Sequence, residues 1–117
     1  MKKFLIILLS FVLSAAAVNS HATAAQDAGW VSLLKRRLQT QSQAYLINNS
    51  VSGETAHGGR KRIEQALKTY RPDIVIVELG GNDGLRGASI EAIRNDLEAI
   101  IEACLRNKVR AAIGALL

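Results

Sequence analysis

The segment that decides the fold is Asp73 to Leu79, which reads DIVIVEL, together with the glycine-bearing stretch Gly80 to Gly87 that follows it. The β-branched residues of DIVIVEL run without the apolar–polar alternation of a half-buried strand. Such a run is typical of a strand that is buried on both faces, as in a parallel sheet. The glycine-bearing stretch then lies at the carboxyl end of the strand, where open parallel sheets bind their ligands.

Segments typical of helices and strands alternate on both sides of this strand. Ala44 to Asn48 is a short apolar run suited to a second buried strand, and a further strand is expected from Val109. Pro72 is expected to end the helix before DIVIVEL, and Ser89 to cap the helix after it. Apolar residues recur at helical spacing in three segments: Trp30, Leu33, Leu34 and Leu38; Ile63, Ala66, Leu67 and Tyr70; and Ile90, Ile93, Leu97, Ile100, Ile101, Cys104 and Leu105. This alternation predicts an α/β fold with helices on both faces of a parallel sheet.

The first 24 residues, MKKFLIILLSFVLSAAAVNSHATA, have the three parts of a secretory signal peptide. Lys2 and Lys3 form a positive start, an apolar stretch runs from Phe4 to Val18, and Ala22-Thr23-Ala24 has the small-x-small pattern of a cleavage site. The apolar stretch is shorter than the roughly 20 residues that cross a bilayer, so an uncleaved anchor is the less favoured alternative. We therefore expect cleavage after Ala24, a periplasmic or secreted location and no stable membrane anchor.

Charge and composition narrow the function further. The 117 residues hold 15 Lys and Arg against 10 Asp and Glu, a formal net charge of +5. The basic triplets at 35–37 and 60–62 lack interleaved aromatic residues, so we interpret them as solvated helix faces and expect no nucleic-acid partner. The single cysteine, Cys104, has no partner for an intramolecular disulfide and is expected to be a small core residue. Because no Cys or His pair has the spacing of a metal site, we expect neither metal nor cofactor.

Two polar, glycine-bearing segments carry the candidate chemistry. The segment 49–59 reads NSVSGETAHGG and follows the expected strand at 44–48, while the segment 80–87 follows DIVIVEL. Since both leave the carboxyl ends of parallel strands, they are expected on one rim of the sheet. The backbone N–H of Gly53 and the side-chain amide of Asn82 are donors suited to one developing oxyanion. In enzymes, removal of one such donor lowers the rate about 100- to 1000-fold.

Other side chains on these segments are weaker candidates for catalysis. His57 is the only histidine after residue 24, but neighbours on one loop seldom form an oriented nucleophile and base. The hydroxyl groups near it belong to Ser50, Ser52 and Thr55. We therefore interpret His57 as a solvated loop residue. Glu78 and Asp83 form an alternative carboxylate pair, although we favour Asp83 as a brace of its own loop and Glu78 as a strand-end residue satisfied locally.

The stretches NNSVSGETAHGG at 48–59 and RPDIVIVELGGNDGLRG at 71–87 resemble the bacterial GDSL-type, or SGNH, ester hydrolases. The likeness is greatest to the exported thioesterase I/lysophospholipase and arylesterase branch, and it runs from about Gly29 to about Ala112. The resemblance implies a flavodoxin-like three-layer sandwich and hydrolysis of small acyl esters or thioesters. It also implies that Gly53 and Asn82 are the two residues of the oxyanion hole.

The chain departs from this family's pattern at the catalytic triad. No Gly-Asp-Ser occurs after a first strand, and no Asp-x-x-His follows the resemblance. We therefore expect residues 25–117 to be a partial SGNH-hydrolase domain that lacks its first strand, its C-terminal portion and its activity. The strands at 44–48 and 73–79 would then have to pair directly. Otherwise they leave unpaired backbone groups, each at a cost of about 1–3 kcal/mol if buried.

Two other functions remain open at this point. One is a non-catalytic remnant that binds acyl chains or a protein partner and self-associates through the apolar surface that a missing strand exposes. The other, less favoured, is an S-adenosylmethionine-binding domain of the methyltransferase type. Glu78-x-Gly80-x-Asn82-x-Gly84 partly resembles the cofactor loop of that family, but Asn82 replaces its middle glycine and no acidic residue follows the next strand. Export from the cytoplasm also argues against this alternative.

Overall fold

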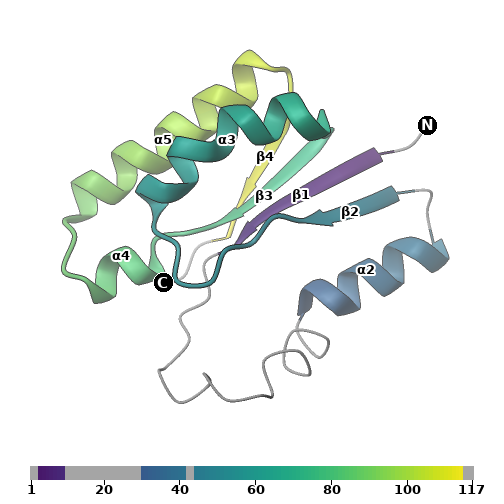
Figure 1. Ribbon diagram of the computed structural model, residues 1–117, viewed down its shortest axis with the longest axis horizontal. Helices are drawn as coiled ribbons and strands as arrows, with labels where there is room; N and C mark the ends of the chain where they lie inside the picture. The colour runs from purple at the N-terminus through teal and green to yellow at the C-terminus, as the bar shows by residue number, and fades with distance from the viewer. Residues whose placement is uncertain (1–2, 10–29, 42–43, 115–117) are drawn as a thin grey trace.

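In the part of the chain that the structure describes, four strands form a parallel sheet with helices on both faces (Figure 1). The computed structural model describes residues 3–9, 30–41 and 44–114. The strand order is β2-β1-β3-β4, and each neighbouring pair is parallel. The strands are β1 (Lys3–Leu9), β2 (Ala44–Asn48), β3 (Ile74–Glu78) and β4 (Arg110–Ile113). The helices are α2 (Trp30–Gln41), α3 (Ala56–Tyr70), α4 (Gly81–Leu85) and α5 (Ile90–Arg106).

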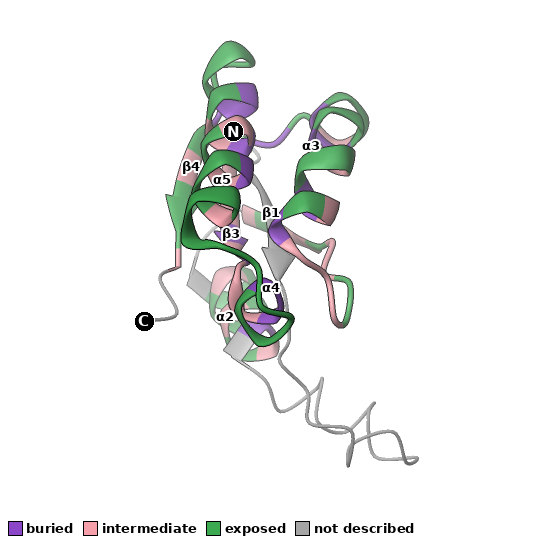
Figure 2. Ribbon diagram, turned by 90° about the vertical axis from the view of Figure 1, so that its left-hand side faces the viewer, coloured by how far each residue is buried: buried purple, intermediate pink, exposed green. Residues whose placement is uncertain are grey.

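The main core lies between β3 and the helices α3 and α5. Val75 and Val77 of β3 are fully buried, and they belong to one apolar cluster with Ile63 of α3 and with Ile100 and Cys104 of α5. Figures 1 and 2 show α3 and α5 side by side over this face of the sheet. The predicted core position of Cys104 is therefore confirmed. The helices in residues 30–41 and 44–114 are all too short or too polar to cross a bilayer.

A smaller apolar cluster lies under α2, on the opposite face of the sheet. Its buried residue is Val31, against which Leu34, Leu46 and Ile76 pack. The prediction of helices on both faces is therefore confirmed. The predicted apolar side of α2 is wrong in one respect, because Leu33 is 55% exposed while Val31 is buried. The helix packs mainly on the edge strand β2.

Strand β1 fills the place in the sheet that was expected to be empty. It pairs with β2 from Lys3–Ala44 to Ile7–Asn48 and with β3 from Leu5–Ile74 to Leu9–Glu78. The predictions of a missing first strand and of direct pairing between 44–48 and 73–79 are therefore wrong. The run FLIILL at 4–9 suits both a signal-peptide core and a doubly buried parallel strand, and periodicity does not separate the two. The predicted cleavage site at Ala24 lies outside the described residues.

Two segments that were expected to be loops contain helical turns. Helix α3 begins at Ala56 because the Thr55 hydroxyl accepts a hydrogen bond from Gly58 N at 3.1 Å and so caps the helix. Residues Gly81 to Leu85 form the short helix α4, which Gly80 precedes with a φ of 112°. The predicted cap of α5 is confirmed, since the Ser89 side chain accepts a hydrogen bond from the backbone of the first turn. Both new helical turns lie at the carboxyl end of the sheet.

Candidate oxyanion site

Gly53 lies in a tight turn between β2 and α3. The backbone N–H of Glu54 donates to the carbonyl of Val51 at 3.2 Å and closes a four-residue turn. Gly53 is the third residue of this turn and has a φ of 76°. A type II turn requires such a left-handed conformation at that position, and glycine adopts it without steric cost. The N–H group of Gly53 itself takes no part in closing the turn.

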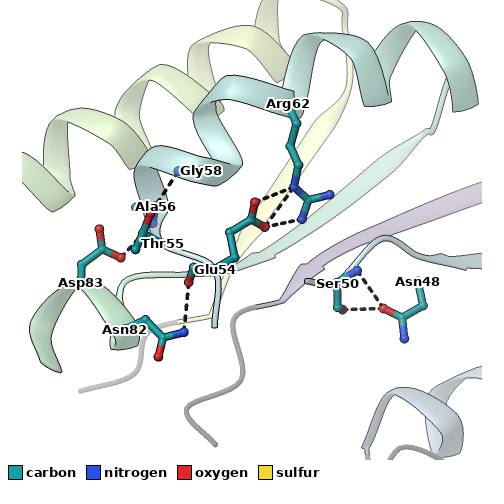
Figure 3. A network of polar contacts seen from close by, with 9 residues as sticks. All are labelled: Asn48, Ser50, Glu54, Thr55, Ala56, Gly58, Arg62, Asn82 and Asp83. Carbon is teal, nitrogen blue, oxygen red and sulfur yellow. Dashed lines mark hydrogen bonds and ion pairs between the residues drawn. The ribbon is translucent and has the colours of Figure 1, made fainter. Parts of the chain in front are cut away.

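Helix α4 brings Asn82 to this turn. Its side-chain Nδ2 donates to the backbone carbonyl of Glu54 at 3.1 Å, across 28 residues of sequence (Figure 3). The asparagine is only 9% exposed, so its amide has little freedom to rotate. The amide carries two N–H donors, and the Glu54 carbonyl fixes the plane in which both lie. Because Glu54 directly follows Gly53, the two residues predicted from sequence are brought to the same turn.

Asp83 connects the same two segments a second time. Its Oδ2 accepts a hydrogen bond from the backbone N–H of Ala56 at 2.8 Å, and the contact is buried. This N–H belongs to the first turn of α3, where backbone donors lack intrahelical partners and a carboxylate is favourable. Asp83 is therefore a brace, as predicted. It holds the start of α3, whereas the sequence suggested that it held its own loop.

The carboxylate of Glu54 is held by Arg62 on α3. Arg62 Nε donates to Oε1 at 2.7 Å and to Oε2 at 3.0 Å, and Nη2 donates to Oε2 as well. The two side chains are only 9% and 24% exposed, so the ion pair is largely withdrawn from water. Our interpretation of the triplet 60–62 as a solvated face is therefore wrong for Arg62. Glu54, the partner of Arg62, lies before the first residue of α3, so the spacing of residues within the helix does not predict this ion pair.

His57 is turned toward α5. Its Nδ1 lies 3.4 Å from Asp96 Oδ1, the same oxygen to which Arg60 Nη1 donates at 3.1 Å. The His57 side chain is 60% exposed, in agreement with a solvated residue, whereas Asp96 is buried. Two of the nearby hydroxyls have other partners: Ser50 bonds the Asn48 side chain and Thr55 caps α3. Within the described residues, none of the three hydroxyl groups is hydrogen-bonded to His57, whose side-chain partner is Asp96.

The alternative sites gain no support from this geometry. Asp83 bonds Ala56, while Glu78 lies beside β4, where a Cβ added at Gly114 would be 3.2 Å from its Cγ. Of the proposed cofactor loop, Asn82 and Gly84 lie in helix α4, Gly80 precedes this helix and Glu78 ends β3, so the segment does not form an open glycine loop. Within the described ranges, no three His, Cys, Asp or Glu side chains are grouped to hold a metal ion.

A comparison with known families covers both segments of this site. The model of the GDSL-like Lipase/Acylhydrolase family matches residues 14–115. The chain belongs to the GDSL-like lipase/acylhydrolase family. The family resemblance drawn from the two glycine-bearing segments is therefore confirmed.

Curated relatives match about two thirds of the chain. Esterase TesA of Pseudomonas aeruginosa is 40% identical over 75 residues, which are 63% of this chain and 37% of that protein. Thioesterase 1/protease 1/lysophospholipase L1 of Escherichia coli K12 is 38% identical over 76 residues, 65% of this chain and 36% of that protein. The matches thus span little more than a third of the length of these relatives.

Solved structures of family members share the fold. The psychrotrophic esterase EstA of a Pseudoalteromonas species, inhibited by monoethylphosphonate, has a TM-score of 0.79 and 33% identity over 95% of this chain and 58% of its own. The crystal structure of TesA has a TM-score of 0.79 and 29% identity over 100% of this chain and 62% of its own. The predicted α/β fold with a parallel sheet is therefore confirmed.

Proposed function

We propose that this chain supplies the oxyanion-binding part of an exported hydrolase of small acyl esters or thioesters. The two donors are the backbone N–H of Gly53 and the side-chain amide of Asn82. The observation that carries the proposal is the hydrogen bond from Asn82 Nδ2 to the carbonyl of Glu54, the residue after Gly53. Membership of the family and the names of its relatives, esterase and thioesterase, support the class of reaction.

The chemistry of acyl transfer explains why two such donors matter. When a nucleophile attacks an acyl carbonyl, the oxygen gains negative charge, and fixed N–H donors stabilise that charge more than they stabilise the ground state. A Cβ added at Gly53 would meet no atom of the described residues within 4 Å, so the Cα side of the turn is open. The buried Asn82 amide is held by the Glu54 carbonyl and needs little reorganisation during the reaction.

Titration with monoethylphosphonate, the inhibitor in the EstA structure, tests the two donors directly. We expect this oxyanion to shift the NMR signals of the Gly53 backbone amide and of the Asn82 side-chain amide. The Asn82→Ala variant should bind about tenfold more weakly or worse, because a hydrogen bond to a charged group contributes about 1.5–3 kcal/mol.

The matched control is Asn95→Ala, which removes an exposed asparagine of α5 and should leave the affinity unchanged. A spectrum with the dispersion of the wild type shows that each variant is folded. Binding that leaves the Gly53 and Asn82 signals in place, or that is equally tight in Asn82→Ala, would refute the proposed site.

A further inference from the structure

A continuous series of contacts joins Arg62 to the Asn82 amide through a single residue, Glu54. The Glu54 carboxylate accepts hydrogen bonds from the Arg62 guanidinium, and the Glu54 backbone carbonyl accepts one from Asn82 Nδ2 (Figure 3). We infer that Arg62 is a positioning residue: by clamping Glu54 it fixes the carbonyl that orients the Asn82 amide. This inference rests on the proposed role of Asn82 in oxyanion binding.

The position of Glu54 in the chain explains why a clamp is useful there. Glu54 directly follows Gly53, whose lack of a side chain leaves the turn with the widest conformational freedom. On the other side, Thr55 caps α3 and Asp83 holds Ala56. Arg62 Nε donates to Oε1 and Nη2 donates to Oε2, a two-point geometry that restricts the direction of the Glu54 side chain as well as its distance. Arg62 of α3 thereby restricts the position of the Glu54 backbone carbonyl, which accepts the hydrogen bond from Asn82.

Gly58 provides independent support for a built clamp. A Cβ at Gly58 would lie 3.0 Å from both Cγ and Oε1 of Glu54 and 3.4 Å from Cδ. The Glu54 side chain therefore lies against the first turn of α3, in space that a Cβ at position 58 would crowd. Glycine is unfavourable in a helix, so its place here matches the need to seat the carboxylate. The low exposure of the pair, 9% for Glu54 and 24% for Arg62, strengthens the interaction relative to a surface ion pair.

The experiment compares Arg62 variants by NMR and by affinity for monoethylphosphonate. In Arg62→Ala we expect the NMR signals of the Asn82 side-chain amide to shift and its hydrogens to exchange faster with solvent. We also expect the phosphonate to bind about tenfold more weakly, because a small misplacement of a site residue can lower an enzyme's rate up to about 100-fold. Arg62→Lys keeps the charge without the two-point geometry and should restore part of the affinity. Arg60→Ala is the matched control, because Arg60 lies on the same helix and bonds Asp96.

The outcomes are separable. Unchanged Asn82 signals and affinity in Arg62→Ala would overturn the inference whatever happens to the melting temperature, and so would an equal effect of Arg60→Ala. If Arg62→Ala does not fold, Glu54→Gln removes the charge but retains the carbonyl and the side-chain length, and unchanged Asn82 signals in that variant overturn the inference. If the wild type does not bind the phosphonate, the proposed function fails. The Asn82 signals of Arg62→Ala then still decide the positioning role.

Discussion

At the residue scale, Gly59 determines how closely α3 approaches the end of β3. A Cβ at this position would lie 2.3 Å from Leu79 Cδ1 and 3.4 Å from Ile100 Cδ1, both in the core. Alanine improves helix propensity by about 1 kcal/mol, but overpacking a core typically costs about 1–3 kcal/mol. We therefore expect Gly59→Ala to lower the free energy of unfolding by about 1 kcal/mol, and by no more than about 2 kcal/mol, measured by urea denaturation.

Gly84 is the matched control for this substitution. It also lies in a helix, α4, but a Cβ there would meet no atom within 4 Å. Gly84→Ala should leave the stability unchanged or raise it by up to about 1 kcal/mol. A Gly59→Ala variant as stable as the wild type would show that α3 can move away from Leu79 at no cost.

Cys104 provides a test of core burial through its acid–base chemistry. Burial, and secondarily the charge of Glu64, raise the pKa of the thiol above its ordinary value of 9.0. The folded protein therefore retains this proton to higher pH than the unfolded chain. The resulting stabilisation is complete below the unfolded pKa and is lost as the pH rises through the folded pKa, that is, in the alkaline range.

We expect iodoacetamide to alkylate Cys104 slowly in the folded protein at pH 8 and rapidly in urea, because the thiolate is the reactive form. In the wild type, unfolding free energy should fall more steeply from pH 8 to pH 10 than in Cys104→Ala. Mass spectrometry follows the first effect and urea denaturation the second. Alkylation of the folded protein at the rate of the unfolded chain would contradict the burial of this thiol.

At the element scale, β1 joins the two halves of the sheet. It pairs with β2 on one side and with β3 on the other, so no other described strand pairs with β2. The proposed cleavage after Ala24 would remove β1 together with the signal segment. We therefore expect a chain of residues 25–117 to lose cooperative unfolding and to self-associate through the backbone edges that β1 covers, since unpaired strand edges template association.

Size-exclusion chromatography and thermal unfolding of the full chain and of residues 25–117 test this expectation. The full chain, kept intact by an Ala24→Leu substitution at the cleavage site, is the control. A monomeric 25–117 chain with a cooperative melt above about 45 °C, the ordinary range for domains, would show that β1 is dispensable.

At the scale of the whole molecule, the proposed oxyanion site is not accompanied by the two sequence motifs that carry the nucleophile, base and acid in the resembled family. Neither Gly-Asp-Ser nor Asp-x-x-His occurs in the sequence. We therefore expect no turnover of p-nitrophenyl butyrate or of a palmitoyl thioester, because donors alone stabilise an oxyanion that no group generates. Turnover that disappears in His57→Ala or Ser52→Ala would contradict this prediction and assign catalysis to the 49–59 segment.

Much of the fold follows from local patterns. The β-branched run at 73–79, the apolar stripe at 90–105 and the cap at Ser89 each depend on residues within a few positions of one another, and each became the expected element. The start of α3 was predicted less well. The two glycines at 58–59 are typical of a loop. The helix begins here through the cap at Thr55, the hydrogen bond from Ala56 to Asp83 and the packing of Gly59 near Leu79.

The sequence by itself determined the alternation of helices and strands, the family, and the two segments that hold Gly53 and Asn82, because these depend on local periodicity and short motifs. The tertiary structure decided which groups meet. The Asp83 carboxylate accepts a hydrogen bond from Ala56, and Arg62 pairs with Glu54. Asn82 donates to the Glu54 carbonyl, 28 residues away in the sequence. The tertiary structure also places Lys3–Leu9 as a central strand. The sequence does not predict this, because an apolar run has the same pattern in a signal segment and in a buried strand. Only the neighbouring strands, which supply its hydrogen bonds, distinguish the two.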